Sequence, residues 1–319
     1  MEIYHGWKQI SQALRALDRR MYGSRPMQTF RPSRIAEVWF WAVLNSRPTN
    51  WACVAHNWPI WSRRFQLPKQ PAMSKRLRDP EVVALLERFE LERRPAPEAA
   101  AAAEPRPSPD AGGTDVSQTG SGTEVAFIDS TPIPISPVSR DRQAGYGYSC
   151  GSTMAKGYRL HAIVSDGRIL SWRLTPMQTS EKEIARRMLC TLVLQGWLVG
   201  DSGYDSNPLH ALLEGRMAAR LLAPRKESSR GGGLGHGRHT EGRLRSIRMT
   251  EGDDASEREQ AAGMLESRTA IERFFSAIKC AAGGLATLPA WVRGYRRVRM
   301  WVLGKLASHQ MQLRPEIAT

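Results

Sequence analysis

Residues 125–129 read Val-Ala-Phe-Ile-Asp, an apolar run that ends at a carboxylate, and residues 197–201 repeat the pattern as Trp-Leu-Val-Gly-Asp. Short apolar runs of this kind are typical of buried strands. A third acidic residue, Glu272, lies within a helical pattern that extends from residue 264 to residue 278. We expect two strand ends and one helix to bring Asp129, Asp201 and Glu272 into a single pocket.

Three carboxylates this close repel one another unless positive charge neutralises them, so the pattern predicts a Mg2+ or Mn2+ site. Sites of this kind commonly act on phosphodiester bonds. Asp205 competes with Asp201 for the second position. Because Asp205 lies beyond the turn that follows the strand, we favour Asp201 and expect Asp205 at the start of the next helix.

The segments around the two apolar runs alternate between strand and helix patterns. Residues 158–165 and 169–174 are rich in strand-forming side chains and flank Asp166-Gly167, a strong signal for a hairpin turn. The next periodic segments predict a helix, a strand, a helix and a strand, at residues 181–194, 197–200, 208–213 and 220–222. This order predicts an α/β domain over residues 125–313 whose sheet mixes antiparallel and parallel strands.

The charge distribution divides the chain into three parts. The 319 residues carry a net charge of +15, which suits a protein that binds a polyanion such as nucleic acid. Residues 1–94 and 125–319 are basic, whereas residues 95–124 are acidic and rich in Ala, Pro, Gly, Ser and Thr. The middle part has too few large apolar groups to offset the entropy of ordering, so residues 95–124 are predicted to be a disordered linker.

Residues 1–94 show apolar side chains at helical spacing and predict a small all-helical DNA-binding domain. Pro71 suits the first turn of a helix that would present Lys75, Arg76 and Arg78 to phosphates or bases. The segment has two interpretations, a helix-turn-helix with this helix in the major groove or a helical bundle with an ordinary basic face. The sequence leaves both open.

A second basic stretch interrupts the α/β domain at residues 224–254, where Gly and Arg are frequent and no clear periodicity is present. Arg225, Lys226 and Arg230 are candidate DNA contacts if this insertion follows DNA, and the alternative is an exposed loop without a ligand. Its glycines match neither the phosphate-binding loop of nucleotide hydrolases nor the dinucleotide-binding pattern. We therefore expect no nucleotide cofactor.

The residues around Glu272 match a known signature. Leu265, Arg268, Glu272 and Lys279 follow the spacing Y-x2-R-x3-E-x6-K, with leucine in place of tyrosine, and the last three fall on one face of a helix. The stretches DSTP at 129–132, KGYRLH at 156–161 and GDSGYDS at 200–206 are also typical of the group. The chain thus resembles the DDE domain of bacterial insertion-sequence transposases over most of residues 125–313.

The resemblance implies a ribonuclease H-like fold in which Asp129, Asp201 and Glu272 bind two Mg2+ or Mn2+ ions. It further implies that Arg268 and Lys279 contact the DNA backbone, and that the protein cleaves transposon ends and transfers them to target DNA. The expected partners are double-stranded DNA, namely terminal inverted repeats and target DNA, and further copies of the chain in a homodimer or larger synaptic complex. A nuclease without strand transfer and a domesticated DNA-binding protein that does not cleave are the alternatives.

The sequence contains no run of 18 or more apolar residues, and its first residues lack the order of a secretory signal. We therefore expect neither membrane insertion nor export. The predicted location is the cytoplasm, in association with the nucleoid.

Overall fold

The computed structural model describes most of the chain, namely residues 2–23, 29–60, 63, 66–92, 125–150, 153–226, 238–280 and 284–312. The predicted linker at 95–124 lies outside the described residues. No helix in the described part of the chain combines the length and hydrophobicity that a membrane span requires.

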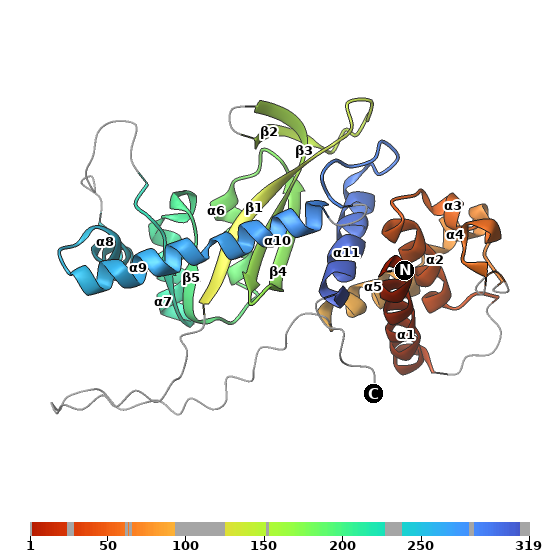
Figure 1. The fold of residues 1–319 in the computed structure, drawn as a ribbon, viewed down its shortest axis with the longest axis horizontal. Helices are drawn as coiled ribbons and strands as arrows, with labels where there is room; N and C mark the ends of the chain where they lie inside the picture. The colour runs from red at the N-terminus through yellow and green to blue at the C-terminus, as the bar shows by residue number, and fades with distance from the viewer. Residues whose placement is uncertain are drawn as a thin grey trace.

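The described elements of the N-terminal part are all helical (Figure 1). They are α1 (Glu2–Tyr22), α2 (Pro32–Leu44), α3 (Thr49–Ala52), the short 3-10 helix η1 (Ala55–Asn57), α4 (Gln70–Arg76) and α5 (Pro80–Leu91). Helix α2 is apolar around most of its circumference and is buried along nearly its whole length. Trp7 packs edge-on against Trp41 and Trp58, with ring centroids 5.8 and 5.3 Å away, so large aromatic rings fill this small core.

The last helix, α11 (Tyr295–Gln312), packs against the N-terminal helices although it follows them by two hundred residues (Figure 1). It lies between α1 and α2 on one side and the central sheet on the other. Lys305 Nζ donates to Ser46 Oγ at 2.9 Å, and Arg299 Nη2 pairs with Glu90 at 3.3 Å. Helix α11 and the N-terminal helices therefore share one hydrophobic core.

The centre of the molecule is a six-stranded mixed sheet. Its strands are β1 (Val125–Pro134), β2 (Gly145–Cys150), β3 (Thr153–Ser165), β4 (Arg168–Pro176), β5 (Gln195–Val199) and β6 (Ala218–Leu222). Strand β3 pairs antiparallel with β1, β2 and β4, whereas β1 with β5 and β5 with β6 are parallel pairs. The predicted mixture of antiparallel and parallel strands is confirmed, and so is the hairpin, where Asp166 and Gly167 both have positive φ.

Alternating side chains of β1 and β5 serve two different cores. Ala126, Ile128 and Leu198 pack against α6 (Glu181–Leu189) and α7 (Asn207–Arg216). Phe127 and Val199 face the other layer, which α10 (Thr269–Cys280) and α11 supply. Because side chains alternate along a strand, Asp129 points to the same face as Phe127, the face that α10 covers.

Several local expectations were wrong in their boundaries, and one strand was missed. Helix α6 ends at Leu189 rather than residue 194, and the expected helix from 264 to 278 is divided into α9 (Ala255–Ser267) and α10. Strand β1 continues past Asp129 to Pro134, because β3 pairs with it after the parallel partner β5 has ended. Strand β2 was not predicted, since its sequence contains two glycines, which are uncommon in strands.

Candidate active site beyond the parallel pairing of β1 and β5

The two aspartates of the predicted site occupy equivalent places on neighbouring parallel strands. The parallel register ends at Phe127 opposite Val199, and each aspartate lies two residues beyond its strand's member of that pair. Asp129 Oδ1 accepts a hydrogen bond from the Ser130 amide at 2.7 Å. Asp201 Oδ1 accepts one from the Gly203 amide at 2.8 Å and so caps the short 3-10 helix η3 (Ser202–Tyr204). The backbone therefore orients both carboxylates just beyond the last parallel pair of β1 and β5. Asp201 follows the end of β5 as expected, whereas Asp129 lies within β1 and not at its end.

The electrostatic environment of Asp129 disfavours its negative charge. Burial, with a further contribution from the nearby Asp201 carboxylate, raises the pKa of Asp129 to about 6, although the Ser130 amide and Arg268 act in the opposite direction. A buried carboxylate beside a second carboxylate favours the arrival of positive charge. The pocket therefore has the electrostatic character that a cation site requires.

Arg268 connects the third carboxylate to the pocket. Its Nη2 lies 2.9 Å from Glu272 Oε1, and its Nη1 lies 3.8 Å from Asp129 Oδ2. Arg268 stands between α9 and α10 but keeps helical dihedral angles, so the i,i+4 spacing to Glu272 survives the division of the helix. The structure thus brings Arg268, Glu272 and Asp129 together, with Lys279 on the last turn of the same helix α10.

Four further side chains lie at this site that the sequence did not single out as functional. Ser130 Oγ donates to Glu181 Oε1 at 2.8 Å, and the Arg159 guanidinium forms an ion pair with Glu181. Tyr204 is almost completely buried, and burial together with the charges of Asp129, Glu181 and Asp201 raises its pKa well above the ordinary value. Three of them, Ser130, Arg159 and Tyr204, lie within the family-like stretches 129–132, 156–161 and 200–206, but that resemblance gave them no role. Their contacts with Glu181 could not be predicted, because they join residues up to 51 positions apart.

Oxygen donors of this type suit Mg2+ or Mn2+. Among the described residues, no three acidic, histidine or cysteine side chains are arranged closely enough to hold an ion. The Arg268 guanidinium contacts the carboxylates of both Asp129 and Glu272. The donor chemistry of the three carboxylates therefore fits a divalent cation, while in this structure Arg268 bridges two of them, Asp129 and Glu272.

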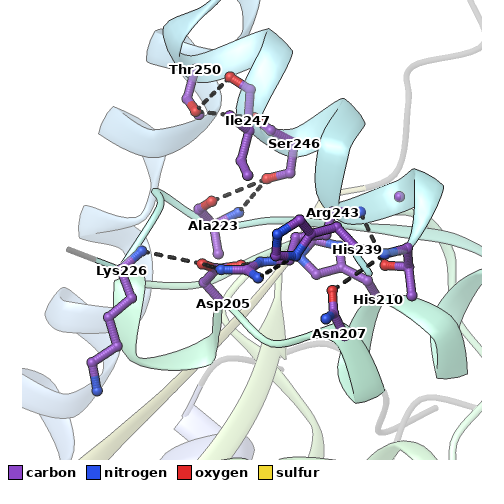
Figure 2. Close-up of polar contacts among 12 residues, drawn as sticks. Asp205, Asn207, His210, Ala223, Lys226, His239, Arg243, Ser246, Ile247 and Thr250 are labelled. Atoms are coloured by element: carbon purple, nitrogen blue, oxygen red, sulfur yellow. Dashed lines mark hydrogen bonds and ion pairs between the residues drawn. The ribbon is translucent and has the colours of Figure 1, made fainter. Parts of the chain in front are cut away.

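Asp205 has a different role from Asp201 (Figure 2). Its carboxylate is buried and accepts hydrogen bonds from Arg243 Nε and Nη2, each at 2.7 Å, and from the Lys226 amide at 3.1 Å. Burial opposes its ionisation, but His210, Arg243 and the Lys226 amide outweigh that effect and hold the pKa of Asp205 below its ordinary value. The expectation that Asp205 begins the next helix was wrong, since Ser206 occupies the cap position of α7 and Asp205 instead binds α8 (Glu241–Glu251).

The basic insertion at 224–254 is partly helical, which the sequence did not predict. Helix α8 occupies residues 241–251, and its buried Ser246 exchanges hydrogen bonds with the backbone of Ala223 at 3.0 and 3.1 Å (Figure 2). Polar contacts of this kind hold the helix in place, so the apolar periodicity is weak. Arg225 forms an ion pair with Glu251 at 3.1 Å, Lys226 is exposed, and Arg230 lies outside the described residues.

The three basic residues predicted near α4 differ in their surroundings. Pro71 lies in the first turn of α4, as predicted, and Lys75 and Arg78 are exposed. Arg76 is half-buried, forms an ion pair with Asp79 and donates to the Phe30 carbonyl at 3.0 Å. Arg76 therefore has structural partners, while Lys75 and Arg78 remain accessible to a ligand.

The fold and the pocket define an α/β domain with a mixed sheet and acidic side chains just beyond a parallel strand pair, consistent with a ribonuclease H-like DDE domain. The family model described as "Transposase DDE domain" matches residues 120–310, more than half of the chain. The protein therefore belongs to the transposase family that carries this domain. Searches of curated proteins and of solved structures gave no significant match.

Proposed function

We propose that the protein is a DNA transposase that cleaves transposon ends and joins them to target DNA, with Asp129, Asp201 and Glu272 as its catalytic carboxylates. The observation that supports this most strongly is the equivalent placement of Asp129 and Asp201 beyond a parallel strand pair, with Arg268 linking Asp129 to Glu272. Family membership supports the reaction class. Asp205 is a poor candidate, because Arg243 already neutralises it.

The three carboxylates would hold two Mg2+ or Mn2+ ions through their oxygens. When bound, such a pair can activate an attacking oxygen and stabilise the leaving oxygen of an in-line phosphoryl displacement. Arg268 and Lys279 would position backbone phosphates beside the carboxylates, because guanidinium and ammonium groups donate charge-assisted hydrogen bonds to phosphate oxygens. We place the protein in the group with the Y-x2-R-x3-E-x6-K signature on the match at Arg268, Glu272 and Lys279.

The test compares cleavage with binding. Asp129→Asn, Asp201→Asn and Glu272→Gln should each reduce cleavage of end-containing DNA in Mg2+ to background, while gel shifts in chelator remain close to wild type. Asp253→Asn and Glu257→Gln are matched controls, because both are exposed carboxylates and neither takes part in the contacts described for Asp129, Asp201 and Glu272. Cleavage at near wild-type rate by any one site variant would remove that residue from the site.

Strand transfer separates this function from its alternatives. A transposase joins the 3'-hydroxyl of a precut end to a second duplex, whereas a nuclease of the same fold only cuts. A domesticated DNA-binding protein would bind duplex DNA in chelator and would neither cut nor join in Mg2+.

Two further experiments test the proposed partners and location. Analytical ultracentrifugation with end-containing DNA would test the proposed homodimer or larger synaptic complex. Microscopy of the tagged protein would test the cytoplasmic, nucleoid-associated location.

A further inference from the structure

A cleft separates the N-terminal helices from the segment that leads into α11. Its volume is about 570 Å3. One wall comes from the end of α2, the following loop and α4, and the other comes from residues 291–301. The cleft is therefore composite, since each of these two parts of the chain supplies only one wall.

Among the described residues that line this cleft, arginine is the only charged type. Arg47 and Arg78 come from the N-terminal wall, and Arg293, Arg296 and Arg297 come from the opposite wall. All five side chains are exposed, and within the described part of the chain none of them forms an ion pair. Five uncompensated guanidinium groups around one cavity repel each other, so a polyanion that enters the cleft relieves this repulsion.

The C-terminal wall is fixed to the central sheet by a buried carboxylate. Asp141 Oδ2 accepts a hydrogen bond from the Gly294 amide at 2.8 Å and another from the Tyr158 hydroxyl of β3 at 2.9 Å. Gly294 has φ +84°, a conformation that favours glycine, and the next amide, that of Tyr295, donates to Gln143 Oε1 at 2.6 Å. These contacts hold the three C-terminal arginines in a defined place relative to the catalytic domain.

We propose that this cleft binds the phosphate backbone of double-stranded DNA, with Arg47 and Arg78 on one side and Arg293, Arg296 and Arg297 on the other. The inference rests on the proposed function for its ligand, DNA. Guanidinium groups recognise phosphate oxygens through paired hydrogen bonds, and their spread over two walls suits successive phosphates of a polymer better than one small anion. Exposed Trp291 adds an apolar surface at the rim against which a sugar can pack.

The consequence is that DNA binding by this protein depends on both ends of the chain. The N-terminal helices alone would supply only Arg47 and Arg78 of the five arginines. A ligand held across the cleft would also bind directly to the segment that Asp141 attaches to β3. End recognition and the catalytic sheet would thus be connected through the protein rather than only through the linker.

The experiment measures the affinity of the full-length protein for a 30-base-pair duplex of arbitrary sequence, in chelator, over a series of salt concentrations. The variants are Arg47→Gln with Arg78→Gln, and Arg296→Gln with Arg297→Gln. Each double variant should bind at least about tenfold more weakly, and the slope of log K against log salt should fall by about 2, since each phosphate contact contributes about 0.9. Arg173→Gln with Arg216→Gln is the control, because both arginines are exposed and lie outside the cleft.

Two further measurements keep the outcome unambiguous. Melting curves of all variants should coincide with wild type, because the substituted side chains are exposed, and Arg296→Lys with Arg297→Lys should restore most of the salt slope. Unchanged affinity and slope for the Arg296/Arg297 variant would overturn the composite cleft while leaving the proposed transposase function intact. Tight binding of a deoxynucleoside monophosphate, lost in the variants while duplex binding is unchanged, would also overturn it. A wild-type protein that fails to bind any duplex would instead refute the proposed function itself.

Discussion

Replacing Asp205 with alanine tests the division of roles between the two neighbouring aspartates, 201 and 205. Asp205 is 4% exposed and accepts two hydrogen bonds from Arg243 and one from the Lys226 amide. Removing it leaves the largely buried Arg243 guanidinium without its counter-charge. We expect the variant to be strongly destabilised and yet to retain cleavage at temperatures where it is folded.

The magnitude follows from the burial of the pair. Breaking a buried ion pair by removing one partner costs about 3 to 5 kcal/mol. At about 2 to 4 °C per kcal/mol for domains of this size, the melting temperature should fall by roughly 6 to 20 °C. Folding lowers the pKa of Asp205. The carboxylate therefore stabilises the folded protein at any pH above the pKa that Asp205 has in the unfolded chain, and this stabilisation is lost as the pH falls through the pKa that it has in the folded protein. The difference in melting temperature between the Asp205→Ala variant and wild type should therefore become smaller only in strongly acidic solution.

The assay combines calorimetric melting with DNA cleavage at low temperature. Glu241→Ala is the matched control, since Glu241 pairs with Arg248 at 2.8 Å on the surface of the same helix α8. Exposed pairs contribute about 0 to 1 kcal/mol, so this control should melt close to wild type. An Asp205→Ala protein that melts within about 2 °C of wild type but no longer cleaves DNA would refute the reasoning and make Asp205, rather than Asp201, the second catalytic carboxylate.

Three other expectations concern the pocket and the α11 interface. Asp129→Asn should stabilise the protein in chelator at pH 7.5 by up to about 3 kcal/mol in denaturant titrations, because it removes a carboxylate whose pKa folding raises to about 6. This gain in the free energy of unfolding should disappear as the pH falls from 6 to 4. A gain that stays constant over that range would contradict the prediction. Arg268→Ala and Lys279→Ala should slow single-turnover cleavage about 100-fold with little loss of DNA affinity, whereas an unchanged rate in a destabilised Arg268 variant would indicate a purely structural role. Gly304→Ala should destabilise the protein by about 1 to 3 kcal/mol in the same titrations, because the new methyl carbon would lie 2.8 Å from a side chain of α2. Gly263→Ala on α9 is the control and should not destabilise, because the added methyl would meet no described atom within 4 Å beyond the adjacent backbone of its own helix.

The sequence alone determined the features that short segments encode. Apolar runs predicted β1 and β5, Asp166-Gly167 predicted the β3–β4 hairpin, and helical spacing placed Arg268 and Glu272 on one face, where they form an ion pair at 2.9 Å. Each of these features depends on residues at most a few positions apart. Local backbone preference and side-chain periodicity therefore sufficed to predict them.

The tertiary structure decided which distant residues share a partner. Arg243, 38 positions downstream, gives Asp205 its structural role, and no local pattern around Asp205 contains that information. Helix α8 and strand β2 were missed because polar contacts and glycines, rather than apolar periodicity, define them. The placement of α11 on the N-terminal helices was likewise beyond the sequence, since an apolar face shows that a helix must be covered but not which of several apolar surfaces will cover it.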